Sequence, residues 1–135
     1  MSRHLLVVAT ESVDPSGVAS TVDRYAGSEA SIHVVVPASS LARLDWLTNA
    51  EDGARREAAD HAVRIANGVR APAEPHVGDV DPLQAIVDAL RTFPADELVL
   101  ITTTVHEAGW LETDLAARSH EQFGLPITHL VAPHR

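Results

Sequence analysis

The chain has 135 residues, 45% of them hydrophobic and 21% charged, which is the size and balance of one globular domain with its own core. It contains no cysteine and no lysine, which excludes a disulfide framework, a thiolate nucleophile, a Walker-type phosphate loop and lysine Schiff-base chemistry. Its net charge of −9 weighs against binding to nucleic acid or an anionic membrane, and no apolar run is long enough to cross a bilayer.

Five short apolar runs predict five β-strands. Most are nearly continuous and rich in β-branched residues, a pattern typical of strands covered on both faces. The third is weaker and contains Pro75, which favours a place at the edge of the sheet. The predicted strands are His4–Ala9, Ser31–Val36, Ala73–Val77, Glu97–Ile101 and Pro126–Val131.

Helical patterns alternate with these strands. The first two cover residues 16–26 and 49–69, and the second carries an apolar stripe of Ala58, Ala62, Ala66 and Val69. The third has Asp81 as a cap and Pro82 at its first position, followed by apolar residues at core-facing spacing. That spacing is set by Leu83, Ile86, Val87 and Leu90. The fourth covers residues 110–123 and ends at Gly124.

The strictly alternating order of strands and helices predicts an α/β fold. Such an order implies a parallel sheet with right-handed crossovers and helices on both faces. We find no internal repeat, no low-complexity tract and no linker, so residues 1–135 are predicted to form a single domain. The absence of a secretion signal and of cysteine leads us to expect a cytoplasmic protein.

Ligands of open parallel sheets bind beyond the carboxyl ends of the strands. In this chain that rim is rich in hydroxyl groups, and threonine also favours strand ends for purely conformational reasons. The candidate ligand-binding residues of the rim are Thr10, Glu11, Ser12, Pro37, Gly78, Asp79, Thr102, Thr103, Thr104 and His106.

Patterns that would carry catalysis or bind a metal ion are missing. His106 and Glu107 begin like a zinc-binding HExxH helix, but Trp110 stands where the second histidine is required. The remaining histidines show no metal-ligand spacing along the chain, and no Gly-x-Ser-x-Gly elbow is present. We therefore expect no catalytic site and no metal site. An enzyme that uses His106 and Glu107 as acid and base is the alternative.

Three stretches resemble the universal stress protein family. They are HLLVVATES at the start, VGDVDPLQAIVDALRTFPADELVLIT in the middle and FGLPITHLVA near the end. The resemblance implies a Rossmann-like domain of the adenine nucleotide alpha hydrolase-like type, with five parallel strands in the order 3-2-1-4-5. It also implies a cytoplasmic homodimer built through the last strand, Ile127 to Val131. Many members of that family bind ATP or another adenine nucleotide.

The glycines that hold ATP in this family are absent here. The family pattern places glycines where this chain has Thr102, Val105 and residues 113–114, and its acidic nucleoside contact falls on Thr10. Without glycines, backbone N–H groups cannot approach phosphates closely. Acidic residues also place negative charge where a triphosphate would lie, namely Glu107, Glu112 and Asp114. We expect no bound ATP and no other cofactor.

The resemblance predicts a non-catalytic, stress protein-like domain that acts through homodimerisation and through a protein partner or small ligand. A divergent binder of a nucleoside or other small molecule, using the cleft at the carboxyl ends of the strands, is the alternative. A phosphorylated receiver domain is disfavoured because it requires a lysine. Neither nucleic acid nor membrane is an expected partner.

Overall fold

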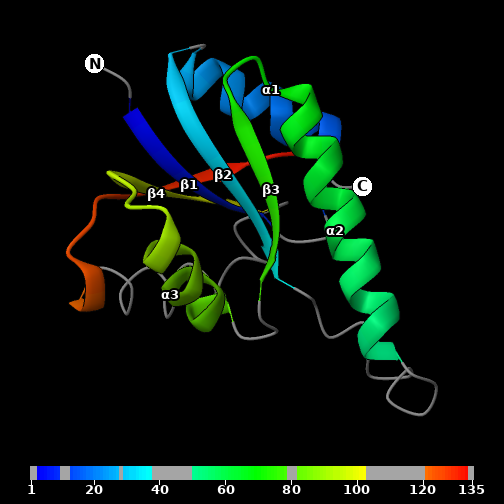
Figure 1. Cartoon of the computed structure of the whole chain (residues 1–135). Helices are drawn as coiled ribbons and strands as arrows, with labels where there is room; N and C mark the ends of the chain where they lie inside the picture. Colours follow the sequence, from blue (N-terminus) through cyan, green and yellow to red (C-terminus); the bar gives the residue numbers. More distant parts are fainter. Residues whose placement is uncertain are drawn as a thin grey trace.

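The computed structural model describes residues 3–9, 13–27, 29–37, 50–78, 82–102 and 121–133 (Figure 1). Its strands are β1 Arg3–Ala9, β2 Ala30–Pro37, β3 Ala73–Gly78, β4 Glu97–Thr102 and β5 Ile127–Val131. Its helices are α1 Pro15–Ala26, α2 Ala50–Gly68 and α3 Pro82–Thr92. All five predicted strands and the first three predicted helices are confirmed, and each end that was predicted for them lies within one residue of the observed end. Most of the predicted fourth helix, residues 110–123, lies outside the described residues; residues 121–123 are described and are helical.

The strands form one parallel sheet in the order β3-β2-β1-β4-β5, as predicted. The edge position of β3 is confirmed, and the opposite edge is β5. Strands β2 and β3 run in register from Ile32 opposite Ala73 to Pro37 opposite Gly78. This register decides which side chains of the two strands meet.

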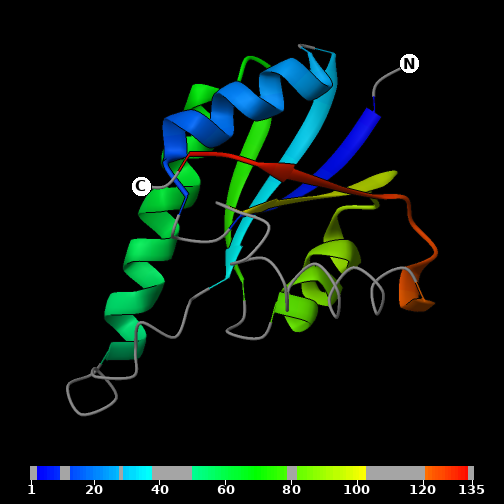
Figure 2. The ribbon, with the colours of Figure 1, turned by 180° about the vertical axis from the view of Figure 1, so that it is seen from behind.

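Helices cover both faces of the sheet, which confirms the predicted α/β layering (Figure 2). Helices α1 and α2 lie on one face and share a core with Leu5, Val34 and Ile101. Helix α3 lies on the other face, where its core includes Leu6 and Leu100. Because alternate residues of a strand point to opposite faces, β1, β2 and β4 need apolar residues at nearly every position.

The local sequence explains how the helices begin and end. Asp14 caps α1, because its carboxylate accepts a hydrogen bond of 3.0 Å from the N–H of Gly17, and Pro15 follows at the first helical position. Gly27 ends α1 with a φ of 71°. No helix within the described ranges is long and apolar enough to cross a membrane.

The buried side of α3 differs from its predicted stripe. Ile86 is buried and Leu90 packs against the core as expected, but the small residues Ala85 and Ala89 occupy the sheet-facing side in place of Val87. Periodicity favoured the larger apolar residues, whereas the close approach of the helix to the sheet selects alanine. This close approach shapes the site described next.

Candidate functional site

Three of the predicted rim residues belong to the described part of the chain. Pro37 and Gly78 end β2 and β3 and lie opposite each other in the sheet. Thr102 is the last residue of β4, is 3% exposed, and its hydroxyl lies 2.6 Å from Nε2 of His129. The sheet therefore brings Pro37 and Gly78 together and places Thr102 apart from them, beyond β1.

The other predicted site residues lie outside the described residues. They are Thr10, Glu11, Ser12, Asp79, Thr103, Thr104 and His106. Glu107, the proposed partner of His106 in an enzyme, also lies outside. Their roles remain predictions.

A pocket of about 140 Å³ lies between α3 and the face formed by β2 and β3. Its wall combines imidazoles, a carboxylate and a hydroxyl with small apolar side chains. The lining residues are His33, Val35, His76, Val77, Gly78, Ala85, Asp88, Ala89 and Thr92. Several polar groups that converge in a concave surface can orient a small polar molecule.

Gly78 determines how closely α3 approaches the sheet. A Cβ atom at this position would lie 2.5 Å from Cβ of Ala85 and 2.8 Å from Cγ1 of Val35, distances that packed atoms do not tolerate. Gly78, which the sequence placed at the ligand-binding rim, therefore allows α3 to pack closely and also lines the pocket. Any larger residue would push α3 away and reshape the pocket.

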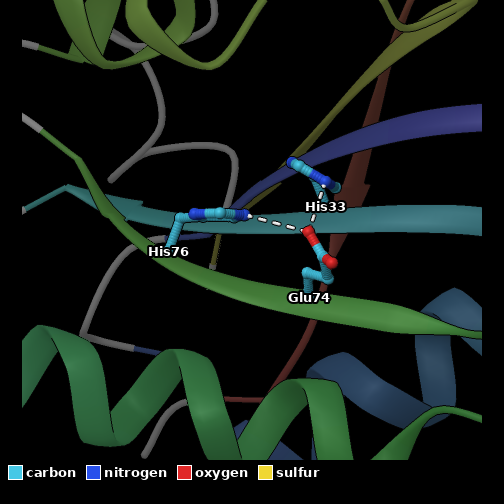
Figure 3. Close-up of side chains that lie close together, drawn as sticks. All are labelled: His33, Glu74 and His76. Carbon is cyan, nitrogen blue, oxygen red and sulfur yellow. Dashed lines mark ion pairs between the residues drawn. The ribbon is translucent and has the colours of Figure 1, made fainter. Parts of the chain in front are cut away.

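Beside this pocket three polar side chains converge on one face of β2 and β3 (Figure 3). His33 of β2 lies opposite Glu74 of β3, and His76 follows Glu74 by two residues, so all three side chains point to the same face. One carboxylate oxygen, Oε2 of Glu74, lies 2.9 Å from Nε2 of His33 and 3.6 Å from Nε2 of His76. Glu74 therefore joins two imidazoles. We call these three residues the histidine cluster.

Aromatic rings hold the buried end of the histidine cluster. The ring of His33 stacks on Phe93, with ring centres 3.8 Å apart and planes at 12°, and it also stacks on His76, with centres 4.5 Å apart and planes at 29°. His4 of β1 meets Phe93 edge-on at 5.7 Å. Because Phe93 is only 9% exposed, it anchors His33 from the end of α3.

Exposure divides the cluster into a fixed member and two accessible ones. The side chain of His33 is 12% exposed, compared with 43% for His76 and 70% for Glu74. Burial lowers the pKa of His33, and the nearby His76 lowers it further, while the Glu74 carboxylate opposes both effects. The neutral imidazole is favoured. Its Nδ1 is buried and has no hydrogen-bond partner within the described part of the chain.

The three side chains form a set of donors that can hold a metal ion. Their ligand atoms all lie within 4.8 Å of one another. Imidazole nitrogen and carboxylate oxygen are common ligands of zinc and related transition metals. Among the described residues, this is where such donors gather.

The histidine cluster escaped sequence-based reasoning because its members come from neighbouring strands. Spacing rules for metal ligands apply within a helix or loop, whereas His33 and Glu74 are joined only by the β2–β3 register. A signal was nevertheless present. Glu74 and His76 stand two residues apart in a predicted edge strand, and such positions share one face.

A second polar cluster lies on the opposite face, at the amino ends of β1 and β4. Both Glu97 oxygens are engaged: Oε1 accepts a 2.8 Å bond from Arg3, and Oε2 accepts bonds from the hydroxyls of Tyr25 and Thr128, the latter at 2.7 Å. The Arg3 guanidinium also lies 5.2 Å from the centre of the Tyr25 ring. We call this group the Glu97 cluster.

Burial alone would raise the pKa of Glu97, but the bonds from Tyr25, Thr128 and Arg3 outweigh it and hold that pKa below its ordinary value. The carboxylate is 14% exposed and has donors on both oxygens. This cluster ties α1, β1, β4 and β5 together. Because both Glu97 oxygens accept hydrogen bonds from other elements of the fold, we interpret this cluster as structural.

Comparison with known proteins supports the architecture. No family model and no curated protein matches the sequence. Among solved structures, the hypothetical protein PH0823 is 14% identical with a TM-score of 0.62, over 98% of this chain and 97% of that chain. A universal stress protein in complex with cAMP is 20% identical with a TM-score of 0.53, over 98% of this chain and 99% of that chain.

The fold is that of a universal stress protein. The predicted architecture and its resemblance to that family are thereby confirmed at the level of the fold, with the strand order 3-2-1-4-5. Identities of 14% and 20% establish no more than the fold. The ligand and the role of this universal stress protein-like domain must be argued from its own residues.

Proposed function

We propose that this chain is a non-catalytic, universal stress protein-like domain of regulatory or stress-response type that binds a small polar ligand and acts as a homodimer. The observation that carries this proposal is the pocket between α3, β2 and β3, which combines apolar and polar walls. Val35, Ala85 and Ala89 supply its apolar surface, and His33, His76 and Asp88 supply groups that can orient a ligand.

The size of the pocket limits its ligand. At about 140 Å³ it is smaller than the 300–1,000 Å³ typical of drug-sized ligands, so it accommodates a compact molecule or one moiety of a larger one. The solved universal stress protein complex with cAMP makes a cyclic nucleotide the first ligand to test. ATP is not expected to bind in the usual way of the family, because Thr102 stands at the first glycine position of the ATP pattern. Its side chain is buried and its hydroxyl contacts His129.

Ligand binding is tested by calorimetric titration with cAMP, adenosine and ATP, together with native mass spectrometry of the purified protein. We expect Ala89→Leu, which fills the pocket, to weaken binding at least about tenfold. Ala59→Leu on α2 is the matched control, because Ala59 is also half-buried but does not line the pocket. Equal binding by the two variants, or micromolar binding of ATP at the wild-type rim, would contradict the proposal.

Homodimerisation has its own supporting observation. Strand β5, Ile127–Val131, lies at the sheet edge, and Val131 is 48% exposed there. An open edge with an exposed apolar side chain favours pairing with a second copy.

Sedimentation analysis should find a dimer that Val131→Asp dissociates. Val63→Asp on α2 should leave it intact, because Val63 is similarly exposed at 41% but lies away from this edge. A monomeric wild type at micromolar concentration would contradict this assignment.

A further inference from the structure

We propose that His33, Glu74 and His76 form a binding site for one divalent transition-metal ion of the zinc class. Two strands of the sheet supply the donors: His33 from β2 and the other two from β3. The proposal does not rest on ligand binding in the pocket. His33 and His76 also line that pocket, whereas Glu74 does not, so titration of the ligand-free protein with a metal ion tests the metal site separately from the pocket.

The two distances from Glu74 to the histidines are near the donor spacing of a tetrahedral zinc site, and all three donor atoms lie within 4.8 Å of one another. Two ligand atoms that each lie about 2.1 Å from a tetrahedral ion are about 3.4 Å apart. The 3.6 Å between His76 Nε2 and Glu74 Oε2 is close to this value. The 2.9 Å between His33 Nε2 and Glu74 Oε2 must lengthen by about half an ångström to reach the tetrahedral spacing. Glu74 is 70% exposed, so its side chain is free to make this adjustment.

The protein scaffold fixes part of the site in advance. His33 is held by its register position opposite Glu74 and by its ring stacking on Phe93 at 3.8 Å. His76 is placed on the same face by the two-residue repeat of β3. The exposure of Glu74 and His76 leaves a path for the ion from solvent. His33 therefore supplies a nitrogen donor that is already held in place, and Glu74 and His76 supply two donors that solvent can reach.

Charge and donor type decide which cations fit. A metal ion binds imidazole through an unprotonated nitrogen, so two imidazoles and one carboxylate bound to the ion would give the set of ligands a charge of −1. Two nitrogen donors favour zinc, nickel and copper over magnesium and calcium, which prefer oxygen. Three protein ligands leave at least one coordination position for water or a small anion.

A simpler account is that Glu74 only hydrogen-bonds two imidazoles and no ion takes part. The experiment that separates the two is calorimetric titration of untagged, chelator-treated protein with Zn²⁺, with Mg²⁺ as a second titrant. We expect one zinc ion per chain and no binding of magnesium. Visible absorption of the Co²⁺-loaded protein reports the tetrahedral coordination independently of any function.

The decisive variants replace the two exposed ligands, Glu74→Gln and His76→Gln, and circular dichroism verifies that both remain folded. Each should weaken zinc binding at least about tenfold. The controls are His4→Gln, on the same sheet face and in contact with Phe93, and Glu57→Gln, on the exposed side of α2; both should bind like the wild type. Absence of zinc binding by the wild type overturns the proposal. Unchanged binding by both ligand variants does so too, because the ion would then occupy other histidines.

Discussion

The histidine cluster and the Glu97 cluster lie on opposite faces of the same sheet. Each is centred on one glutamate near the start of a strand, Glu74 in β3 and Glu97 in β4. Glu97 is 14% exposed and receives hydrogen bonds on both oxygens from three different elements. Glu74 is 70% exposed, and the two imidazoles that meet it share a single oxygen. The first carboxylate accepts three hydrogen bonds from the protein on its two oxygens, whereas the second has one oxygen that neither imidazole contacts within ion-pair distance.

The difference follows from position in the sheet. Glu97 begins β4, which has β1 and β5 as neighbours, and α1 brings Tyr25 over it. Glu74 belongs to the edge strand β3, so it has a strand neighbour on only one side. A polar side chain surrounded by other elements forms its hydrogen bonds within the fold, whereas one on an edge strand remains accessible to a ligand.

Removing the two carboxylates one at a time should produce the largest contrast. Glu97→Ala leaves the Tyr25 and Thr128 hydroxyls without their acceptor in a partly buried site, so we expect a loss of about 3 kcal/mol in the free energy of unfolding. Glu74→Ala removes an exposed pair and should cost no more than about 1 kcal/mol. Urea denaturation at pH 7 measures both. Equal losses would break the distinction between the clusters.

Acid should weaken the Glu97 cluster next. Because the pKa of Glu97 is lowered in the folded state, its contribution to stability is fully present above its ordinary pKa of 4.5 and is lost as pH falls through the folded value. The loss should be smaller than that of Glu97→Ala, since a protonated carboxyl still forms hydrogen bonds. The free energy of unfolding should therefore fall more between pH 7 and about pH 3 for the wild type than for Glu97→Gln. Parallel profiles would show that this carboxylate does not contribute.

The sequence predicted the elements better than the clusters. Apolar runs and local signals such as Pro82 and Gly124 locate strands and helix ends, because each depends on neighbours in the chain. The order of the strands came from the family resemblance, since alternation alone does not specify it. Glu97 was recognisable only as the first residue of a strand, and His33 only as a polar residue in an apolar one. Their partners come from distant segments, and only the folded register brings them together.

The smallest effect concerns a single hydrogen bond of the Glu97 cluster. Thr128→Val keeps the shape of the side chain but removes the 2.7 Å bond to Glu97 and the 3.0 Å contact with the Tyr25 hydroxyl, so we expect a loss of about 1 kcal/mol in stability. Thr92→Val is the matched control, because that exposed hydroxyl donates only a 3.3 Å bond to the carbonyl of Ala89 at the end of α3. It should change stability by less than about 0.5 kcal/mol. Thermal and urea unfolding of the pair give the difference directly. If Thr128→Val lowered the stability no more than its control, Arg3 and Tyr25 would suffice to hold the carboxylate, and the third hydrogen bond to Glu97 would not be needed for stability.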